Sequence, residues 1–211
     1  MDIAVLGTGS VGRTIAGRLR ELGHAVKIGT RDPQATSARA EDDPAAPLTT
    51  YADAAARAEL VVLAVAGAAA LDVLALAGAE SLAGKVLVDI TNPLDFSAGF
   101  PPNLLVKDTD SLGEQIQRAF PEARVVKTLN TLTAPLMVHP KTLGSSGTVF
   151  MSGDDPAAKA VVAGLLIAFG HDDVIDLGGI ETARGTEMWM PLWLRLMQAL
   201  GTGEFNLKIV R

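Results

Sequence analysis

The fold is decided by residues 2–30, which read DIAVLGTGSVGRTIAGRLRELGHAVKIGT. Residues 2–6 form a short, mostly apolar run directly before glycines, which is typical of a buried strand. The segment from Ser10 to Leu22 has apolar residues at helical spacing, and Gly23 stands where a helix commonly ends in a left-handed conformation. Residues 25–28 predict a second strand. Strand, glycine-rich turn, helix and strand within about thirty residues are the pattern of a βαβ unit.

The turn between the first strand and the helix has the spacing G-x-G-x-x-G. Between a strand and a helix this spacing predicts a dinucleotide site. The first glycine permits the tight turn, the second lets the backbone approach a pyrophosphate, and the third lets the helix pack close to the strand. Free N–H groups and the positive end of the helix dipole then face the phosphates. The expected contacts are Gly7, Thr8, Gly9, Ser10, Val11 and Gly12.

The end of the second predicted strand indicates which dinucleotide binds. Proteins that use NAD place Asp or Glu there, about 20 residues after the glycines, to bond the ribose 2′-hydroxyl. This chain instead has the hydroxyl of Thr30 and the guanidinium of Arg31 at that place. Asp32 is the nearest acid, but it precedes Pro33, and we expect a turn there that directs its carboxylate away from the ribose. A guanidinium suits a phosphate because its planar fork donates two parallel bonds. Thr30 and Arg31 therefore predict NADP(H), the alternative being that Arg31 only pairs with a surface carboxylate.

Strand-like and helix-like segments alternate through the rest of the chain. The further predicted strands are residues 60–65, 85–90, 124–128, 148–151 and 174–177. The further predicted helices are residues 52–58, 66–76, 111–120, 154–169 and 180–200, with loops over the rest of 34–58 and over 97–108. This alternation predicts an α/β fold, a Rossmann-type doubly wound parallel sheet with a C-terminal extension of helices and strands. We expect residues 1–211 to form a single NADP-binding domain, within which residues 148–211 are the smaller extension.

Ligands of such a sheet bind beyond the carboxyl ends of its strands, so the residues that follow each strand are candidates for the site. The cofactor candidates of this kind are Ala64, Val65, Ala66, Asn92, Asn130 and Thr131. The two asparagines are suited to bonding the carboxamide or the ribose, and they are equally suited to capping turns. Lys127, late in the strand over 124–128, is interpreted as a surface lysine rather than a functional cation.

Composition excludes several kinds of chemistry. The chain has no cysteine, which excludes disulfides, thiolate catalysis and cysteine-bound metals. Its three histidines do not cluster at metal-ligand spacing and no nucleophile motif is present, so we predict no metal site and no catalytic side chain. A net charge of −6 without a basic run argues against nucleic acid and anionic membranes as partners.

Two further expectations concern location and assembly. The N-terminus lacks the layout of a signal peptide, and no apolar stretch reaches the ~18 residues of a membrane span, so we expect a cytoplasmic protein. The predicted helix over 180–200 is apolar nearly all round, which predicts burial, against another subunit in a homodimer.

The chain also resembles the family of NADP oxidoreductases that depend on coenzyme F420, a deazaflavin. The resemblance runs nearly from end to end, and it is carried by residues 7–12, 23–24, 29–31, 92–94, 126–131, 176–178 and 183–184. The same pattern occurs in the NADPH-binding reductase domain of the six-transmembrane metalloreductases, which passes electrons to flavin and haem. The resemblance implies NADP(H) as cofactor and F420 as a small-molecule redox partner.

In the deazaflavin enzymes the nicotinamide and the deazaflavin lie face to face at the strand ends, and hydride moves directly between them. The protein then mainly orients both rings and excludes water. By resemblance, the adenosine-phosphate half is held by Thr8, Ser10, Val11, Thr30 and Arg31. The cleft is lined by Asn92, Pro93 and Leu94, of which Pro93 and Leu94 are the expected substrate contacts. Two alternatives stay open: an NADPH-dependent reductase of a flavin, quinone or ferric chelate, and a non-catalytic NADPH-binding sensor.

Overall fold

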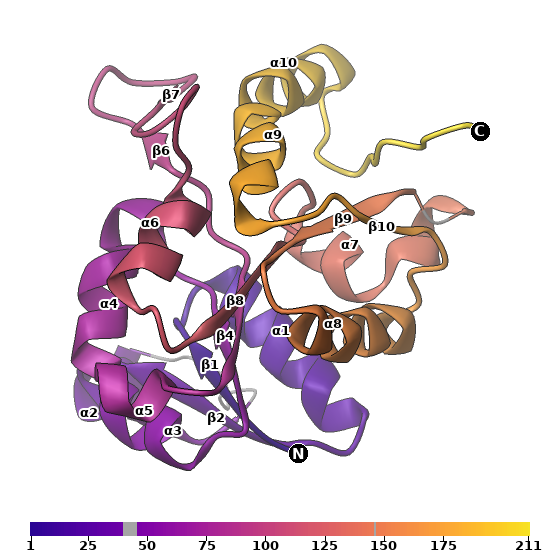
Figure 1. The fold of residues 1–211 in the computed structure, drawn as a ribbon. Helices are drawn as coiled ribbons and strands as arrows, with labels where there is room; N and C mark the ends of the chain where they lie inside the picture. The colour runs from indigo at the N-terminus through magenta and orange to yellow at the C-terminus, as the bar shows by residue number, and fades with distance from the viewer. Residues whose placement is uncertain (40–45, 146) are drawn as a thin grey trace.

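The computed structural model describes residues 1–39, 46–145 and 147–211, and a sheet of eight strands runs through its centre (Figure 1). The strands lie in the order β10-β9-β8-β5-β4-β1-β2-β3. Their bounds are β1 (Asp2–Leu6), β2 (Ala25–Thr30), β3 (Leu48–Thr50), β4 (Leu60–Leu63), β5 (Val86–Asp89), β8 (Arg124–Thr128), β9 (Val149–Ser152) and β10 (Val174–Asp176). From β1 the chain continues to β2 and β3 on one side, and after β3 it crosses to β4 on the other side of β1. The carboxyl end of β1 is therefore the point where the strand order reverses.

The neighbouring strands are parallel throughout, except that β8 and β9 are antiparallel. The expected doubly wound α/β sheet is thus confirmed, and the expectation that all its strands run the same way is wrong for β9 and β10. The connection after β8 explains the difference. Helix α7 (Ala134–Val138) has five residues, which is too short to carry the chain back along the sheet, so β9 begins near the end at which β8 finishes.

Helices cover both faces of the sheet. One apolar cluster joins the sheet to α1, α7 and α8, and a second joins its other face to α3, α4, α5 and α6. The remaining bounds are α1 (Ser10–Glu21), α2 (Pro33–Arg39), α3 (Tyr51–Arg57), η1 (Gly67–Ala69), α4 (Ala70–Ala77), α5 (Ala79–Leu82), α6 (Leu112–Ala119), η2 (Pro140–Leu143), α8 (Pro156–Phe169), η3 (Ile180–Thr182), α9 (Ala183–Met188) and α10 (Met190–Leu200). Among the described residues, no helix combines the length and the apolar character needed to cross a bilayer.

Two stretches expected to be loops contain short elements. The loop expected within 34–58 contains α2 and the edge strand β3, while its residues 40–45 lie outside the described residues. The expected loop over 97–108 is confirmed except at β7 (Asn103–Leu104), which pairs with β6 (Leu94–Asp95) in a hairpin that rises above α4 and α6 (Figure 1). Strands of two or three residues are too short to show a periodicity, so no sequence signal indicated β3, β6 and β7.

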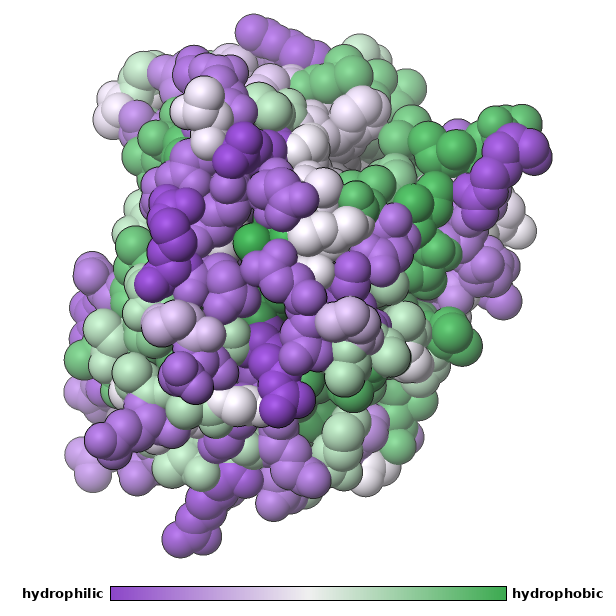
Figure 2. Space-filling view, viewed as in Figure 1, coloured by the Kyte–Doolittle hydropathy of each residue, from purple (hydrophilic) through white to green (hydrophobic). Residues whose placement is uncertain are grey.

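The single helix expected over 180–200 is wrong, because the structure divides it into η3, α9 and α10. Pro191 stands in the first turn of α10, where it lacks an N–H group and its ring would crowd the carbonyl four residues earlier. Within the single chain the helix is not buried all round, since Leu192 and Leu200 are 49% and 57% exposed. Apolar residues gather over α10 and the C-terminal tail in Figure 2. The homodimer stays a prediction.

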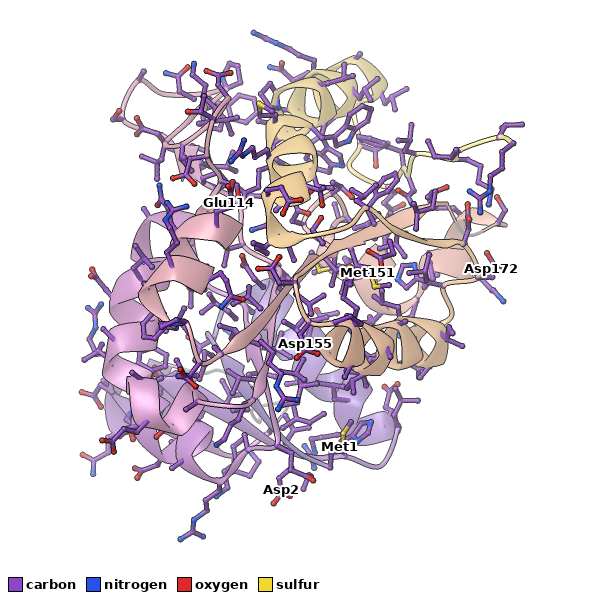
Figure 3. The ribbon with its side chains drawn as sticks, in the orientation of Figure 1. Met1, Asp2, Glu114, Met151, Asp155 and Asp172 are labelled. Carbon is purple, nitrogen blue, oxygen red and sulfur yellow. The ribbon has the colours of Figure 1, made fainter. Side chains whose placement is uncertain are left out.

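Removing the cap of α8 tests the fold. Asp155, labelled at the start of α8 in Figure 3, accepts a 2.8 Å bond from the amide of Ala158. Asp155→Ala should lower the free energy of unfolding by about 1 kcal/mol, because an N-terminal amide loses its acceptor. Thermal unfolding measures the loss. Asp155→Asn keeps the acceptor and should retain most of the stability, so an equal loss in both variants would show that the cap is not the cause.

Candidate functional site

The glycine-rich turn is built by close backbone packing between β1, α1 and β4. Gly7 has a φ of +128°, and a Cβ at this position would lie 2.2 Å from the carbonyl oxygen of Ala64. A Cβ on Gly12 would lie 2.2 Å from the carbonyl oxygen of Gly7. Neither position has space for a side chain, so α1 lies directly against the strands. The first and third glycines therefore have the packing roles that the sequence predicts.

Gly9 differs from these two glycines, because a Cβ added to it would meet no atom of the described residues within 4 Å. Internal packing therefore does not require a glycine here, whereas a ligand that approaches the backbone does. Gly9 is the N-cap of α1, no side chain caps this helix, and its first turn holds no acidic residue. The amides of the first turn and the positive end of the helix dipole are thus available to an anionic group.

A cleft of about 560 Å³ begins at this turn and runs along the carboxyl ends of the strands. That volume lies within the range of roughly 300–1,000 Å³ that is usual for small-molecule sites. The candidates that line it are Gly9, Ser10, Val11, Ala64, Val65, Ala66, Asn92 and Leu94. The candidates outside its lining are Gly7, Thr8, Gly12, Thr30, Arg31, Pro93, Asn130 and Thr131.

The cleft also has lining residues that are not among the predicted contacts. They are Gly67, Ala68, Ile90, Thr91, Asp95, Phe96, Leu105, Leu132 and Met137. Ile90 and Thr91 follow β5, so the strand-end rule already pointed to them. Phe96 and Leu105 belong to the β6–β7 hairpin and its continuation, and both are more than half exposed. This exposed apolar wall gave no sequence signal, because the hairpin itself was not predicted.

Thr30 and Arg31 lie at the end of β2, on the opposite side of β1 from β4 and β5. Arg31 is exposed, and within residues 1–39, 46–145 and 147–211 its guanidinium has no hydrogen-bond or ion-pair partner. Thr30 is buried, with its hydroxyl oxygen 3.0 Å from that of Thr36. As expected, the carboxylate of Asp32 is turned back into α2, where it accepts a 2.9 Å bond from the amide of Ala35. The charged group free to meet a phosphate at this strand end is therefore Arg31.

Asn92 and Asn130 bond to each other across the ends of β5 and β8. Asn92 Nδ2 donates to the carbonyl oxygen of Asn130 at 2.7 Å, and Asn130 Nδ2 donates to Asn92 Oδ1 at 2.9 Å. Asn130 Nδ2 also donates to the carbonyl oxygen of Thr186 in α9 at 3.1 Å. The pair holds the amide of Asn92 in one orientation at the edge of the cleft. Thr131, the residue after Asn130, is buried and does not line the cleft.

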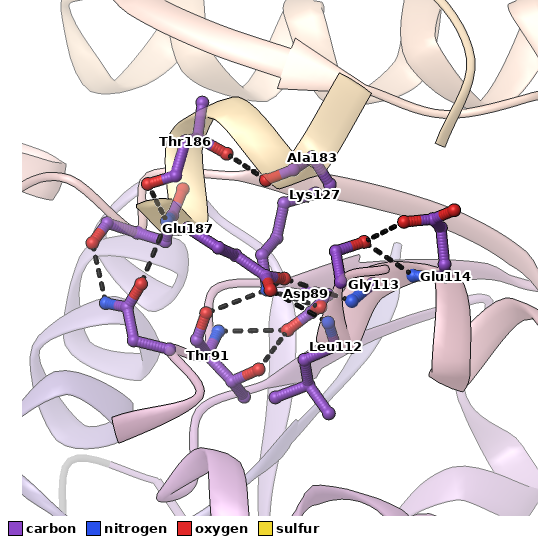
Figure 4. A network of polar contacts seen from close by, with 12 residues as sticks. Asp89, Thr91, Leu112, Gly113, Glu114, Lys127, Ala183, Thr186 and Glu187 are labelled. Atoms are coloured by element: carbon purple, nitrogen blue, oxygen red, sulfur yellow. Dashed lines mark hydrogen bonds and ion pairs between the residues drawn. The ribbon is translucent and has the colours of Figure 1, made fainter. Parts of the chain in front are cut away.

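The interpretation of Lys127 as a surface lysine is wrong, because only 1% of the residue is exposed. Its ammonium lies 2.8 Å from Asp89 Oδ2, 2.8 Å from Glu187 Oε1 and 2.8 Å from the carbonyl oxygen of Thr91 (Figure 4). Burial disfavours the charge of this ammonium, but the two carboxylates outweigh burial and raise the pKa of Lys127 above its usual value. Its partners lie 38 and 60 positions away in the chain, so no local pattern could reveal them.

The carboxylate of Glu187 also reaches the beginning of α6. It accepts bonds from the amides of Leu112 at 2.8 Å and Gly113 at 3.0 Å. Beside it, Glu114 forms a bidentate pair with Arg184 of α9, and the Arg184 guanidinium holds the pKa of Glu114 below its usual value (Figure 3 shows Glu114 facing α9). Ser111 caps α6, since the amide of Glu114 donates to Ser111 Oγ at 3.1 Å.

The cleft offers no group suited to proton transfer near neutral pH. Among its described lining residues the ionisable side chain is Asp95, and the amide of Ser97 bonds to its carboxylate and lowers its pKa. His171 is buried away from the lining and its Nε2 lies 2.9 Å from the carbonyl oxygen of Met137. No group of three or more His, Asp or Glu side chains with the arrangement of a metal site occurs in the described parts of the chain.

Comparisons with known proteins agree with this geometry. Residues 2–93 match the family model described as NADP oxidoreductase, coenzyme F420-dependent. The chain is 31% identical over 212 residues to the F420-dependent NADP reductase of Methanothermobacter marburgensis. The aligned region covers 93% of this chain and 92% of the relative. A crystal structure from Arthrobacter sp. FB24, assigned as an F420-dependent NADP reductase, has 61% identity and a TM-score of 0.97 over 100% of both chains.

A metalloreductase is also similar. STEAP3 of Rattus norvegicus is 29% identical over 186 residues, which cover 88% of this chain and 35% of that protein. The chain therefore spans about a third of the length of this relative. The similarity confirms the second part of the resemblance, which was to the NADPH-binding domain of the metalloreductases.

The relative from M. marburgensis matches nearly the whole of both chains, and the Arthrobacter structure has the same fold from end to end. The glycine-rich turn, the open side of Gly9 and the strand-end cleft are the parts of the fold that such proteins need for a dinucleotide. The chain therefore belongs to the family of F420-dependent NADP oxidoreductases, and its activity is NADPH-linked oxidation and reduction.

Proposed function

We propose that this protein catalyses reversible hydride transfer between NADPH and coenzyme F420 in the cleft at the strand ends. The observation that carries the proposal is the cleft itself. The cleft begins at a turn suited to an anion and ends at an exposed apolar wall. Its lining has no side chain suited to act as an acid or a base near neutral pH. Hydride transfer between two bound rings needs orientation and exclusion of water rather than an acid or a base.

The pyrophosphate and adenosine half would lie at the turn and at the end of β2. The open face of Gly9 and the uncapped start of α1 fit a pyrophosphate. The exposed guanidinium of Arg31 fits the 2′-phosphate, with Thr30 beside it. The residues that we assign to this half are Gly7, Thr8, Gly9, Ser10, Val11, Gly12, Thr30 and Arg31.

The nicotinamide half would extend the other way, past β4 and β5, because the dinucleotide crosses the sheet where the strand order reverses. The residues that we assign to it are Ala64, Val65, Ala66, Asn92, Asn130 and Thr131. Small side chains after β4 leave space for a ring, and the fixed amide of Asn92 fits a carboxamide. Asn130 would act through Asn92 rather than from the lining of the cleft.

The deazaflavin would lie between the nicotinamide and the β6–β7 hairpin. Leu94, Phe96 and Leu105 give this side of the cleft an apolar surface suited to a flat ring, and Pro93 holds the chain at the base of the hairpin. When bound, the two coenzymes supply the hydride chemistry themselves. The side chains of the hairpin would orient the second ring and keep water away from it.

The similarity to the metalloreductase favours a second candidate, reduction of another acceptor by NADPH. A flavin, a quinone or a ferric chelate would use the same turn and the same cleft. A sensor that binds NADPH without turnover would use only the turn. The acceptor assay below separates these functions, because each predicts a different dependence of NADPH oxidation on the added acceptor.

Turnover tests the acceptor directly. NADPH and F420 mixed with the protein should lose absorbance at the deazaflavin band, because the acceptor ring is reduced. The same assay with flavin, quinone or ferric chelate in place of F420 should give little NADPH oxidation. Tight NADPH binding without loss of the deazaflavin band would contradict the proposal. Oxidation that depends on one of the other acceptors would favour the second candidate.

Two glycine variants test the turn. Gly9→Ala should keep the free energy of unfolding of the wild type, because its methyl group meets no protein atom, and should weaken NADPH binding by at least about tenfold, because the methyl group meets the pyrophosphate. Gly12→Ala is the matched control. Its methyl group would meet the Gly7 carbonyl, so it should lower the free energy of unfolding by about 1–3 kcal/mol. Calorimetric binding and thermal unfolding measure both; NADPH affinity unchanged in Gly9→Ala would exclude this turn as the pyrophosphate site.

Arg31 decides the choice between NADPH and NADH. Arg31→Ala should weaken NADPH binding by ~1.5–3 kcal/mol, the value of a lost charged contact, and should leave NADH binding nearly unchanged. Dissociation constants for the two coenzymes provide the comparison. Arg118→Ala is the control, because this arginine pairs with Asp110 at 2.7 Å outside the lining of the cleft, and it should leave both dissociation constants unchanged. Equal losses for NADPH and NADH in Arg31→Ala would contradict the assignment of Arg31 to the 2′-phosphate.

A further inference from the structure

The buried network around Lys127 takes no part in the hydride transfer proposed above. It consists of Lys127, Asp89 and Glu187, which come from the ends of β8 and β5 and from α9. The side chain of Lys127 is fully buried, and so are those of its two partners apart from 1% of Glu187. With Thr91 as third acceptor, each of the three ammonium protons of Lys127 has an oxygen at 2.8 Å.

A network of this kind is a poor way to gain stability. Two carboxylates and one ammonium leave one negative charge in excess, and removing three charges from water is costly. The amides of Leu112 and Gly113 at the start of α6 offset part of that cost at Glu187. Apolar side chains of the same volume would often hold these elements together as well or better. However, the hydrogen bonds between buried ionic groups are directional, so they define the positions and orientations of the bonded groups more strictly than apolar contacts do.

What the network fixes is the segment of the cleft that follows β5. Thr91 and Asn92 both line the cleft. Asp89 Oδ1 accepts from the amide and the hydroxyl of Thr91 at 2.9 Å and 2.7 Å, while Lys127 donates to the carbonyl of Thr91. The next residue, Asn92, is held by Asn130, which is bonded in turn to α9. Thr91 is thus held by Asp89 and Lys127, and Lys127 in turn contacts Glu187 of the C-terminal extension (Figure 4). Asn92 reaches the extension through Asn130 and the carbonyl oxygen of Thr186.

The amide of Asn92 retains bonding capacity toward a ligand. Its described bonds to Asn130 use one proton of Nδ2 and one lone pair of Oδ1. One proton and one lone pair therefore remain, which is the complement of a carboxamide. The amide can bond such a group on both sides only if its plane is fixed beforehand, and the network provides that constraint.

We propose that Lys127, Asp89 and Glu187 are positioning residues that fix Thr91 and Asn92 for the nicotinamide half of NADP(H), and that α9 is thereby part of the coenzyme site. The proposal rests on the proposed NADP(H) site and is independent of F420. It also assigns residues 148–211 to the same functional unit as the glycine-rich turn, because Glu187 and Thr186 belong to the extension.

A comparison of two ligands tests this proposal. NADPH carries the nicotinamide, whereas adenosine 2′,5′-bisphosphate occupies only the adenosine side. Glu187→Gln keeps the size of the side chain and removes its charge from Lys127. It should weaken NADPH binding by about tenfold, as expected for one well-placed hydrogen bond, and should change binding of the bisphosphate less than about twofold. Dissociation constants by calorimetry on the full chain give both values.

Two more variants keep the outcome decisive. Asn130→Ala cuts the link between Asn92 and α9 while leaving the three charges in place, so it should reproduce the selective loss even if Glu187→Gln fails to fold. Thr148→Val removes an equally buried bond, 2.6 Å to Asp173, away from the cleft, and should lower stability without changing either affinity.

Each result has one meaning. Equal weakening of both ligands would show a merely structural role. Unchanged NADPH affinity in a folded Glu187→Gln would overturn the proposal whatever Asn130→Ala did, and unchanged NADPH affinity in Asn130→Ala would overturn the role of α9 in fixing Asn92. If the wild-type protein bound neither ligand, the NADP(H) site itself would be wrong, which is a different failure.

Discussion

The structure depends on the direct contact of α1 with the backbone of β1 and β4. Gly7 and Gly12 leave no side chain between them, and either Cβ would lie 2.2 Å from a carbonyl oxygen. This contact sets the start of α1 at the point where the strand order reverses, with its free amides facing the cleft. The same constraint therefore creates the proposed anion site and would set the direction in which a dinucleotide runs.

A second constraint acts at the far end of the cleft. There the chain returns through α9, and its carboxylate Glu187 meets Lys127 and the start of α6. The first constraint is made by the absence of side chains, and the second by buried charges. Between them lie the residues after β4 and β5, which are small or have a fixed amide. The cleft is thus bounded by close backbone packing on one side and by buried ion pairs on the other, while the β6–β7 hairpin above it exposes Phe96 and Leu105.

Local patterns in the sequence predicted much of this arrangement. The βαβ unit, the end of α1 before Gly23 and the helix α8 depend on neighbouring residues, and the structure has each of them. Residues predicted from strand ends fall on the cleft or directly behind it, because parallel strands end together.

The failures concern contacts between distant parts of the chain. Lys127 was interpreted as a surface residue because its two carboxylates lie far away in sequence. The β6–β7 hairpin and β3 have strands of two or three residues, too short for a periodic signal. The break before α10 had a local cause, Pro191, which the apolar pattern of residues 180–200 outweighed in the prediction.

The central claim is that two coenzymes lie in contact in a cleft whose lining has no group suited to proton transfer near neutral pH. Transfer of an isotope from NADPH deuterated at C4 of the nicotinamide tests it most directly. When the deuterium is on the face of the nicotinamide from which hydride leaves, it should appear at C5 of the reduced deazaflavin, and none should be released to water. Deuterium in the solvent, or reduced deazaflavin that carries only solvent hydrogen, would contradict direct transfer and with it this account of the site.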